Sequence, residues 1–148
     1  MNTRLGERHP RGFSLIELLI VVAVIGIIAA IAVPNLTSSR KAANEAAAIA
    51  HLRSWTSAQE LYFQRFGSYA DDHTLLEEQG LAGEANPDRL GYSFRLETPS
   101  LAEWQGFADP ITDSVTGDRS FFIDQTAVIR WSLGAEAGPV SPPLGYSP

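Results

Sequence analysis

One acidic side chain, Glu17, stands out among the residues that could do chemistry, because it lies inside an apolar run. The sixteen residues from Leu18 to Val33 carry no charge, and Glu17 is the only charged residue between Phe13 and Val33. A carboxylate held in lipid costs on the order of 2.5–3.5 kcal/mol, so an acid placed here predicts a cationic partner. As a helix rising about 1.5 Å per residue, this run would cover roughly 30 Å, the thickness of the hydrocarbon core of a bilayer. We therefore expect a transmembrane helix over residues 13–33 whose first turn carries a functional carboxylate.

The residues around Glu17 resemble a known processing signal. The run Gly12-Phe13-Ser14-Leu15-Ile16-Glu17 is similar to the cleavage and methylation motif of type IV prepilins and of the pseudopilins of type II secretion. The resemblance implies that a dedicated peptidase cuts between Gly12 and Phe13 and methylates the new N-terminal amine of Phe13. It also implies an assembly role for Glu17, which would meet the N-terminal amine of a neighbouring subunit in a fibre.

Elementary electrostatics supports the pairing that the resemblance implies. Cutting before Phe13 would create an ammonium group one helical turn from Glu17, and the helix dipole also favours an anion near this end. A single chain would satisfy this charge pair imperfectly, whereas stacked subunits could satisfy it between chains. The pair would then set the register of one subunit on the next.

The charge distribution predicts which side of the membrane each part occupies. Residues 1–12 carry a net charge of +2, residues 13–66 one of +1, and residues 67–148 one of −9. A basic segment before an apolar span stays in the cytoplasm, so residues 1–12 are predicted to be a cytoplasmic leader and the acidic part to be exported. This places the chain in the inner membrane as a single-pass protein, and the resemblance implies a later place in a pilus or pseudopilus fibre. An acidic head argues against nucleic-acid binding.

Two other fates of the apolar run remain open. Ala30-Ile31-Ala32 is an A-x-A triplet at which a secretory signal could be cut, leaving Val33 at the N-terminus. An uncut signal anchor would instead keep residues 1–12. The length of the run, the acid at its start and the helical pattern beyond the triplet favour the prepilin-type cut.

The composition predicts one long helix over residues 13–66, followed by a globular extracytoplasmic head over residues 67–148. Pro34 removes a backbone N–H where the span leaves the membrane, so a kinked but continuous helix is expected there. In the second half of this helix, small and large side chains fall on roughly opposite stripes. The small stripe comprises Ala43, Ala46, Ala47, Ala50, Ala58 and Leu61, and the large stripe comprises Ile49, Leu52, Trp55, Phe63 and Phe66. Either the large stripe packs on the head and the small one on neighbouring helices, or the alanines are simply good helix formers.

The rest of the chain predicts a small antiparallel sheet, and hence an α+β fold. Gly67 is expected to cap the long helix, and Thr74 to open a short helix that stops at Gly80. Strands are predicted over residues 92–96 and 104–108, and in a hairpin of residues 120–123 and 128–131, with coil over residues 83–89 and 134–148. The chain has no cysteine, so its C-terminal end must be held by packing alone, whereas many type IV pilins close a loop there with a disulfide.

No catalytic, cofactor or metal site is predicted, and an enzyme is not expected. The sequence lacks the P-loop, nucleophile-elbow and H-E-x-x-H patterns. His51 is interpreted as a solvated helix residue, and Asp71-Asp72-His73 as a helix start, because three adjacent residues rarely converge on one ion. The acidic segment of residues 109–118 has the hard oxygen ligands that calcium prefers, but the favoured interpretation is a polar loop between two strands.

The leading hypothesis is therefore a structural subunit of a type IV pilus or pseudopilus. The partners that the resemblance implies are identical or related pilin subunits, the prepilin peptidase and methyltransferase, an inner-membrane assembly platform and membrane lipid. The alternative is a single-pass, membrane-anchored extracytoplasmic binding module, which would be neither cut at Gly12 nor assembled into fibres.

Overall fold

The computed structural model describes residues 12–82 and 91–145. Residues 1–11 of the predicted leader and the predicted loop of residues 83–89 lie outside the described residues. The chain divides into two compact units, Met1–Leu36 and Thr37–Pro148, and we call the second the head unit. Helix α1, Leu15–Phe66, is continuous and supplies residues to both units. It begins two residues later than predicted and ends where predicted.

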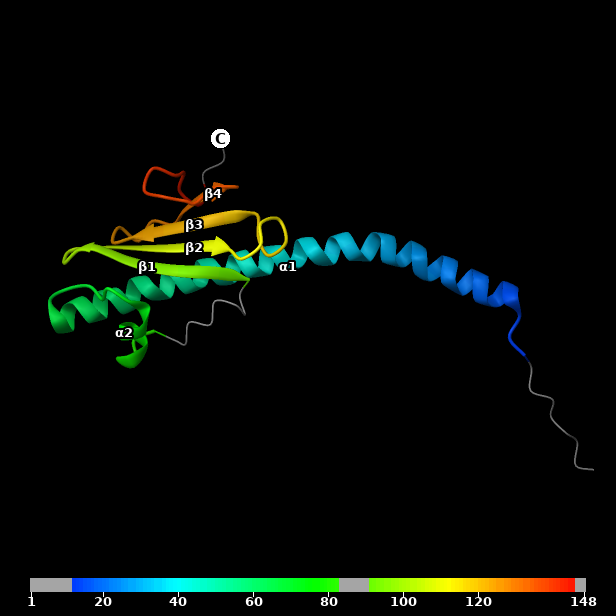
Figure 1. Ribbon diagram of the computed structural model, residues 1–148, viewed down its shortest axis with the longest axis horizontal. Helices are drawn as coiled ribbons and strands as arrows, with labels where there is room; N and C mark the ends of the chain where they lie inside the picture. Colours follow the sequence, from blue (N-terminus) through cyan, green and yellow to red (C-terminus); the bar gives the residue numbers. More distant parts are fainter. Residues whose placement is uncertain (1–11, 83–90, 146–148) are drawn as a thin grey trace, which may run out of the picture. The chain divides into compact units, whose positions relative to one another are not determined.

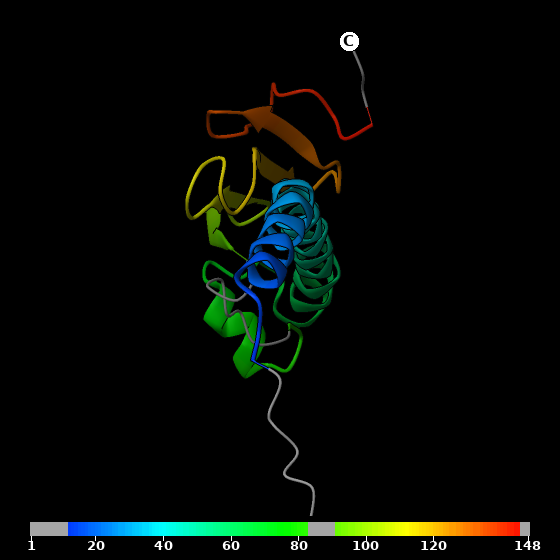
Figure 2. The ribbon, with the colours of Figure 1, turned by 90° about the vertical axis from the view of Figure 1, so that its right-hand side faces the viewer.

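In the head unit, α1 is followed by the short helix α2 and by four strands. Their bounds are α2 His73–Glu78, β1 Tyr92–Ser100, β2 Glu103–Pro110, β3 Arg119–Asp124 and β4 Arg130–Leu133. The strands form one antiparallel sheet of order β1-β2-β3-β4, in which each strand pairs with the next along the chain (Figure 1). The view along α1 shows the helix and the sheet of the head unit as two layers (Figure 2). The predicted α+β fold, with a long N-terminal helix packed on a small antiparallel sheet, is confirmed.

The helix packs on the sheet through a stripe of buried residues spaced three or four apart. This stripe comprises Glu45, Ala48, Leu52, Trp55, Ala58 and Gln59. Trp55 is fully buried, and its ring centroid lies 6.0 Å from that of Phe94 on β1. A Cβ atom added at Gly106 of β2 would lie 3.1 Å from Trp55, so the missing side chain lets the indole approach the strand closely. Leu52 and Trp55 thus face the head, as predicted.

The two predicted stripes of α1 need correction at three residues. Phe63 and Phe66 are 37% and 48% exposed and do not belong to the buried stripe of α1. Their rings contact Tyr69 and Tyr62 instead, at centroid distances of 4.8 and 4.4 Å. Ala58, assigned to the outward stripe, is fully buried in the core.

The strands follow the predicted alternation of side chains. Tyr92, Phe94 and Leu96 of β1 point toward the core, while Ser93 and Arg95 are exposed. β1 and β2 both extend beyond their predicted ends, and the predicted hairpin is present as β3 and β4 with Phe122 opposite Arg130. β4 begins at Arg130, two residues later than expected.

The short helix has a different N-cap from the predicted one. Asp72 occupies the cap position, and its Oδ1 accepts a hydrogen bond from the Thr74 backbone amide at 3.0 Å. Thr74 therefore lies inside α2. The Asp72 carboxylate, and not the Thr74 hydroxyl, accepts a free backbone amide of the first turn. Gly67 takes the left-handed conformation predicted for it, with φ of 75°, and donates its amide to the Phe63 carbonyl.

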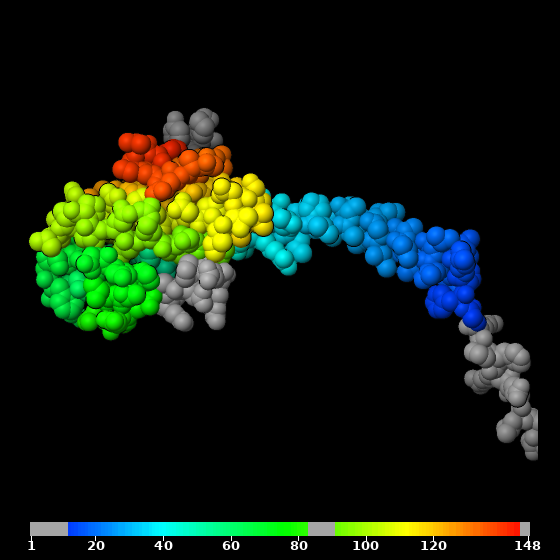
Figure 3. Space-filling model, viewed as in Figure 1, coloured from blue at the N-terminus to red at the C-terminus, as the bar shows by residue number. Residues whose placement is uncertain are grey.

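The C-terminal segment, described to residue 145, is a coil held on the sheet by non-covalent contacts. Ala137 is buried against Phe107 and Phe122 on the outer face of the sheet. Arg95 pairs with Glu136, and its guanidinium lies 3.9 Å from the centroid of the Phe107 ring. The segment, orange to red in Figure 3, lies on the surface of the head unit. These contacts hold the chain end in a protein without cysteine.

Candidate assembly site

The start of α1 places Glu17 in the first helical turn. Ser14 directly precedes the helix, and its carbonyl oxygen accepts the backbone amides of Glu17 and Leu18 at 3.1 and 3.3 Å. Serine followed three residues later by glutamate is also the spacing of a capping box, a signal that favours a helix start here. Gly12 and Phe13 precede the helix, and Phe13 is 79% exposed. The peptide bond between Gly12 and Phe13 therefore lies in chain without regular secondary structure, just before the turn of α1 that carries Glu17.

The part of the first unit that the structure describes presents an apolar surface, in which Glu17 is the one charged residue. Every residue from Phe13 to Leu36 is exposed, and α1 is the one helix in the described residues that is long and apolar enough to cross a membrane. Monomeric soluble proteins rarely expose more than a few hundred square ångströms of contiguous apolar surface. This surface needs lipid or other protein chains to cover it.

Pro34 lies inside α1, and the helix continues through it. A proline has no amide hydrogen, so the helical hydrogen bond from residue 34 to the carbonyl of residue 30 cannot form. The kink predicted at Pro34 stays a prediction.

Two of the acidic residues that were considered as metal ligands, Asp72 and Asp118, have structural partners. Asp72 caps α2 and lies 2.9 Å from Nδ1 of His73. Asp118 receives the Lys41 ammonium at 2.8 Å, and Asp109 is half-buried, which raises the pKa of its carboxyl. Across the described ranges, no group of three or more His, Cys, Asp or Glu side chains is arranged to hold a metal ion.

His51 is only partly exposed, whereas a solvated helix residue was predicted. Its ring lies 4.4 Å from that of Phe94 and 5.2 Å from that of Trp55, and its Nε2 atom is buried without a hydrogen-bond partner. Burial lowers the pKa of this imidazole, and nearby His73 lowers it further, while Glu77 raises it. The strand β1 covers this position of α1, a contact that the sequence of the helix alone does not reveal.

A set of side chains on α1 holds the loop between β2 and β3. Lys41 pairs with Asp118, and the Asn44 side-chain amide donates to the Thr116 carbonyl at 2.8 Å. Glu45, 8% exposed, accepts the Asp118 backbone amide at 3.1 Å and the Arg119 guanidinium at 2.7 and 3.0 Å. We call Lys41, Asn44 and Glu45 the helix–loop clamp.

A second polar contact holds the chain that follows α1. The fully buried Gln59 side chain donates to the Ala70 carbonyl and accepts the Ala70 amide, both at 2.9 Å. Sequence analysis missed Glu45 and Gln59. Both lie in the buried stripe, whose residues are spaced three or four apart. A polar residue on an otherwise apolar helix face was therefore the sequence signal that could have predicted a buried polar contact.

Comparisons with known proteins agree with the geometry of the first unit. Residues 8–33 match the family model described as the prokaryotic N-terminal methylation motif. The type IV wide pilus major component PilA4 of Thermus thermophilus is 43% identical over 58% of this chain and 64% of its own length. The type IV major pilin protein PilA of Myxococcus xanthus is 42% identical over 60% of this chain and 40% of its own length.

A second group of relatives comes from a secretion apparatus. The type II secretion system core protein G of Escherichia coli is 33% identical over 58% of this chain and 63% of its own length. The chain thus spans less than two thirds of the length of each of these relatives. The names of all three describe structural components and not enzymes.

Proposed function

We propose that this chain, which belongs to the family of type IV pilins and type II secretion pseudopilins, is a structural subunit of a type IV pilus or pseudopilus. The observation that carries the proposal is the match of residues 8–33 to the N-terminal methylation motif, together with the exposure of every residue from Phe13 to Val33. A fibre covers such a surface by bundling many copies of the helix, so the work of this protein is mechanical.

Maturation would supply the cation that Glu17 needs. A prepilin peptidase cuts between Gly12 and Phe13 and methylates the Phe13 amine, so residues 1–12 are lost as a leader. The chain is anchored in the inner membrane by residues 13–33 with its head unit exported, and an inner-membrane assembly platform then moves it into the fibre. There the Glu17 carboxylate pairs with the amine of a neighbouring identical or related subunit, because an unpaired charge is costly in an apolar core.

The mass of the mature N-terminus tests the processing step. Protein isolated from its native membrane is expected to begin with N-methylated Phe13. A chain that begins at Met1 would indicate a membrane-anchored binding module, and one that begins at Val33 would indicate a secretory signal. Either result contradicts the proposal.

Fibre formation tests the role of Glu17. Glu17→Ala is expected to insert into the membrane and be processed, yet to leave sheared fibre fractions empty. Glu78→Ala, which removes an exposed carboxylate from α2, is the control and should assemble normally. Fibres of Glu17→Ala as abundant as those of the wild type would contradict a pairing role for this acid.

A further inference from the structure

We propose that a pocket at the end of α1 binds a free quaternary ammonium ion, held against the rings of Tyr62 and Tyr69 and beside the carboxylate of Asp71. The pocket lies wholly within the head unit. The proposal goes beyond the proposed function and does not depend on it, because it assigns a small-molecule site to the head unit whether or not the chain assembles into fibres.

Four segments of the head unit form this pocket, which we call the tyrosine pocket. Tyr62 comes from α1, Tyr69 and Asp71 from the chain between the two helices, and Leu75 from α2. The end of β1 and the turn that follows it, with Leu101, complete the wall. The volume of the pocket is about 550 Å³, which lies within the range of small-molecule sites.

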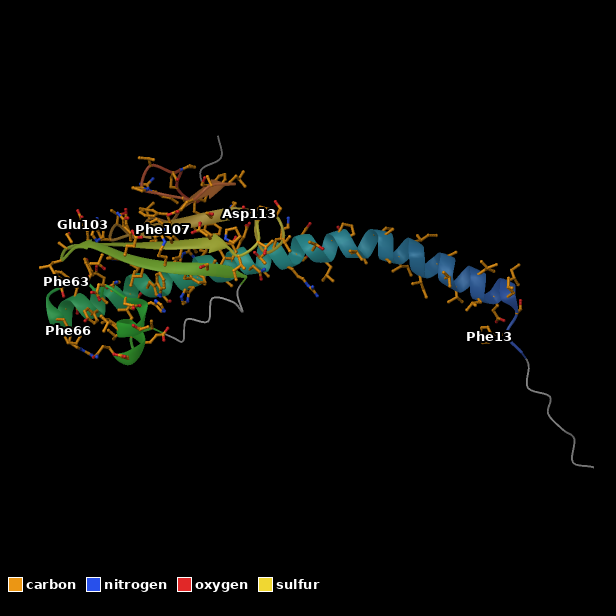
Figure 4. The ribbon with its side chains drawn as sticks, viewed as in Figure 1. Phe13, Phe63, Phe66, Glu103, Phe107 and Asp113 are labelled. Carbon is orange, nitrogen blue, oxygen red and sulfur yellow. The ribbon has the colours of Figure 1, made fainter. Side chains whose placement is uncertain are left out.

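The two tyrosine rings of the pocket pack against neighbouring phenylalanines. The centroid of the Tyr62 ring lies 4.4 Å from that of Phe66, and the centroid of the Tyr69 ring lies 4.8 Å from that of Phe63. Figure 4 shows Phe63 and Phe66 at the end of α1. Because these contacts restrict the rings before a ligand arrives, binding costs less side-chain entropy.

The backbone around Tyr69 is held on both sides. Ala70 exchanges two hydrogen bonds with the Gln59 side chain at 2.9 Å, and its carbonyl also accepts the Thr98 hydroxyl at 2.9 Å. The Tyr69 amide donates to the Leu101 carbonyl at 3.4 Å. These bonds tie together three of the segments that form the pocket, so the pocket is formed before any ligand binds.

The charges of the pocket favour a cation over an anion. Among the described lining residues Asp71 is the one charged side chain, and it makes no hydrogen bond or ion pair with any other described residue. The Tyr69 hydroxyl donates to a Glu60 carboxylate oxygen at 3.2 Å. Burial, and after it Glu60, raise the pKa of Tyr69, so the phenol stays protonated. A phenol that donates to a carboxylate has a more electron-rich ring, whose face attracts a cation more strongly.

The hydroxyl groups of the pocket favour a quaternary ammonium over a ligand that needs many hydrogen bonds. Three of the five lining residues with a hydroxyl, Tyr69, Thr98 and Ser100, already use it in a hydrogen bond within the head unit. A saccharide or a primary ammonium would need several partners that these groups cannot all supply. A quaternary ammonium needs no hydrogen bond, since its methyl groups pack on aromatic and apolar surfaces such as Tyr62 and Leu75.

Ligand-observed NMR of the full-length protein can test whether binding requires the positive charge. The protein would be kept in micelles of a polyoxyethylene detergent, which carries neither a charge nor a sugar. It would be titrated with choline, with the uncharged isostere in which carbon replaces the quaternary nitrogen, and with glucose. We expect choline to bind about fivefold or more tightly than the isostere, because the tyrosine faces and Asp71 attract only the charged compound. Glucose should not bind measurably.

Two pairs of variants locate the site. Tyr62→Leu removes an aromatic face and should weaken choline binding by about threefold or more, whereas Tyr62→Phe keeps the face and should bind like the wild type. Asp71→Asn should weaken binding by about twofold or more. Asp113→Asn removes a charge at the other end of the head unit (Figure 4) and should have no effect. Both aspartates are exposed, so these two variants should keep the melting temperature of the wild type.

Phosphocholine distinguishes a free cation from a lipid headgroup. It carries the cation of choline together with a phosphate, and should bind about threefold or more weakly than choline, because the described lining residues include an acid and no base. Binding of phosphocholine as tight as that of choline would overturn the assignment to a free ion.

Three further results would refute the tyrosine pocket as a cation site. These are the absence of choline binding, binding of the isostere or of glucose as tight as that of choline, and an equal effect of Asp71→Asn and Asp113→Asn. None of them bears on fibre formation, which Glu17→Ala tests separately.

Discussion

Glu45 and Arg119 lie 74 residues apart in the chain, and the Glu45 Oε2 atom accepts two hydrogen bonds from the Arg119 guanidinium, at 3.0 and 2.7 Å. The other carboxylate oxygen accepts the Asp118 backbone amide. One acid on α1 thus fixes the start of β3. The sequence neighbourhood of Glu45 is rich in alanine, so this acid is one of the few groups on that part of α1 that can specify where the loop docks.

Removing the Glu45 charge should destabilise the head unit. We expect Glu45→Gln to lower the free energy of unfolding by about 2 kcal/mol, since the amide cannot satisfy both the guanidinium and the Asp118 amide. Glu103→Gln, at an exposed position at the start of β2, is the control and should change it by less than about 0.5 kcal/mol. Urea titration of the full-length protein in detergent, followed by tryptophan fluorescence, measures both. Equal midpoints for the two variants would show that the clamp carries no stability.

The Gln59 side chain should be similarly hard to replace. Gln59→Ala leaves the Ala70 amide without its partner, while the Ala70 carbonyl keeps the hydrogen bond from Thr98. The lost hydrogen bond and the cavity together predict a loss of about 2–4 kcal/mol in the free energy of unfolding. Gln64→Ala, on the exposed side of the helix, serves as the matched control. The prediction is wrong if both variants unfold at the same urea concentration.

Gly117 is predicted to tolerate no side chain. A Cβ atom at this position would lie 2.1 Å from the Tyr92 hydroxyl oxygen, which itself donates to the Arg119 carbonyl at 2.7 Å. Gly117→Ala should therefore cost about 2 kcal/mol or more, because the buried Tyr92 ring cannot move aside without strain in the core. Gly138→Ala, which meets no atom within 4 Å, should be neutral or slightly stabilising. Thermal melting of the two variants compares them directly, and a Gly117→Ala protein as stable as Gly138→Ala would contradict the contact.

The partly buried His51 should make the stability depend on pH. Its pKa in the folded protein is below the ordinary value of 6.5, so the unfolded chain binds the proton more readily. The contribution of His51 to the free energy of unfolding is therefore complete above pH 6.5 and is lost as the pH falls from 6.5 through the lowered pKa. Burial is the main cause of the lowered pKa; the charge of Glu77 opposes it, and the charge of His73 adds to it.

A variant without the imidazole isolates this effect. His51→Phe keeps an aromatic ring against Phe94 and Trp55, and should reduce the fall in melting temperature between about pH 7.5 and about pH 5.5. His73→Gln should keep most of that fall. If His51→Phe has the same pH dependence as the wild type, another group is responsible.

The sequence predicted the elements of the head unit because their signals are local. The alternation of apolar and polar residues in β1 identified Tyr92, Phe94 and Leu96 as the residues that face the core. Gly67 was identified as the residue that ends α1, because glycine adopts the left-handed backbone conformation without steric cost. Gly12, Phe13 and Glu17 lie within one six-residue motif, so proposing them as a site needs no knowledge of the fold, and their roles stay a prediction.

The misassignments have a common physical cause, since they depend on contacts made far along the chain. Helical periodicity gives the direction in which Phe63 and Phe66 point, but not how completely other parts of the head unit cover their rings. The burial of His51 and the clamp at Glu45 depend on β1 and on the loop before β3, which approach α1 only in the folded protein. The periodic pattern of one helix therefore predicts which of its faces is apolar better than it predicts which parts of the chain contact that face.

The way the C-terminal segment meets β4 has a consequence for crowding. The Trp131 amide donates to the Pro142 carbonyl and the Leu144 amide to the Ile129 carbonyl, at 3.0 and 2.7 Å, and neither Pro142 nor Pro143 has an amide with which to recruit another strand. An open strand edge is a template for pairing between molecules, and proline is one of the residues that blunt it. Where many copies of the protein are packed at high local concentration, this arrangement keeps the β4 edge from pairing with another molecule.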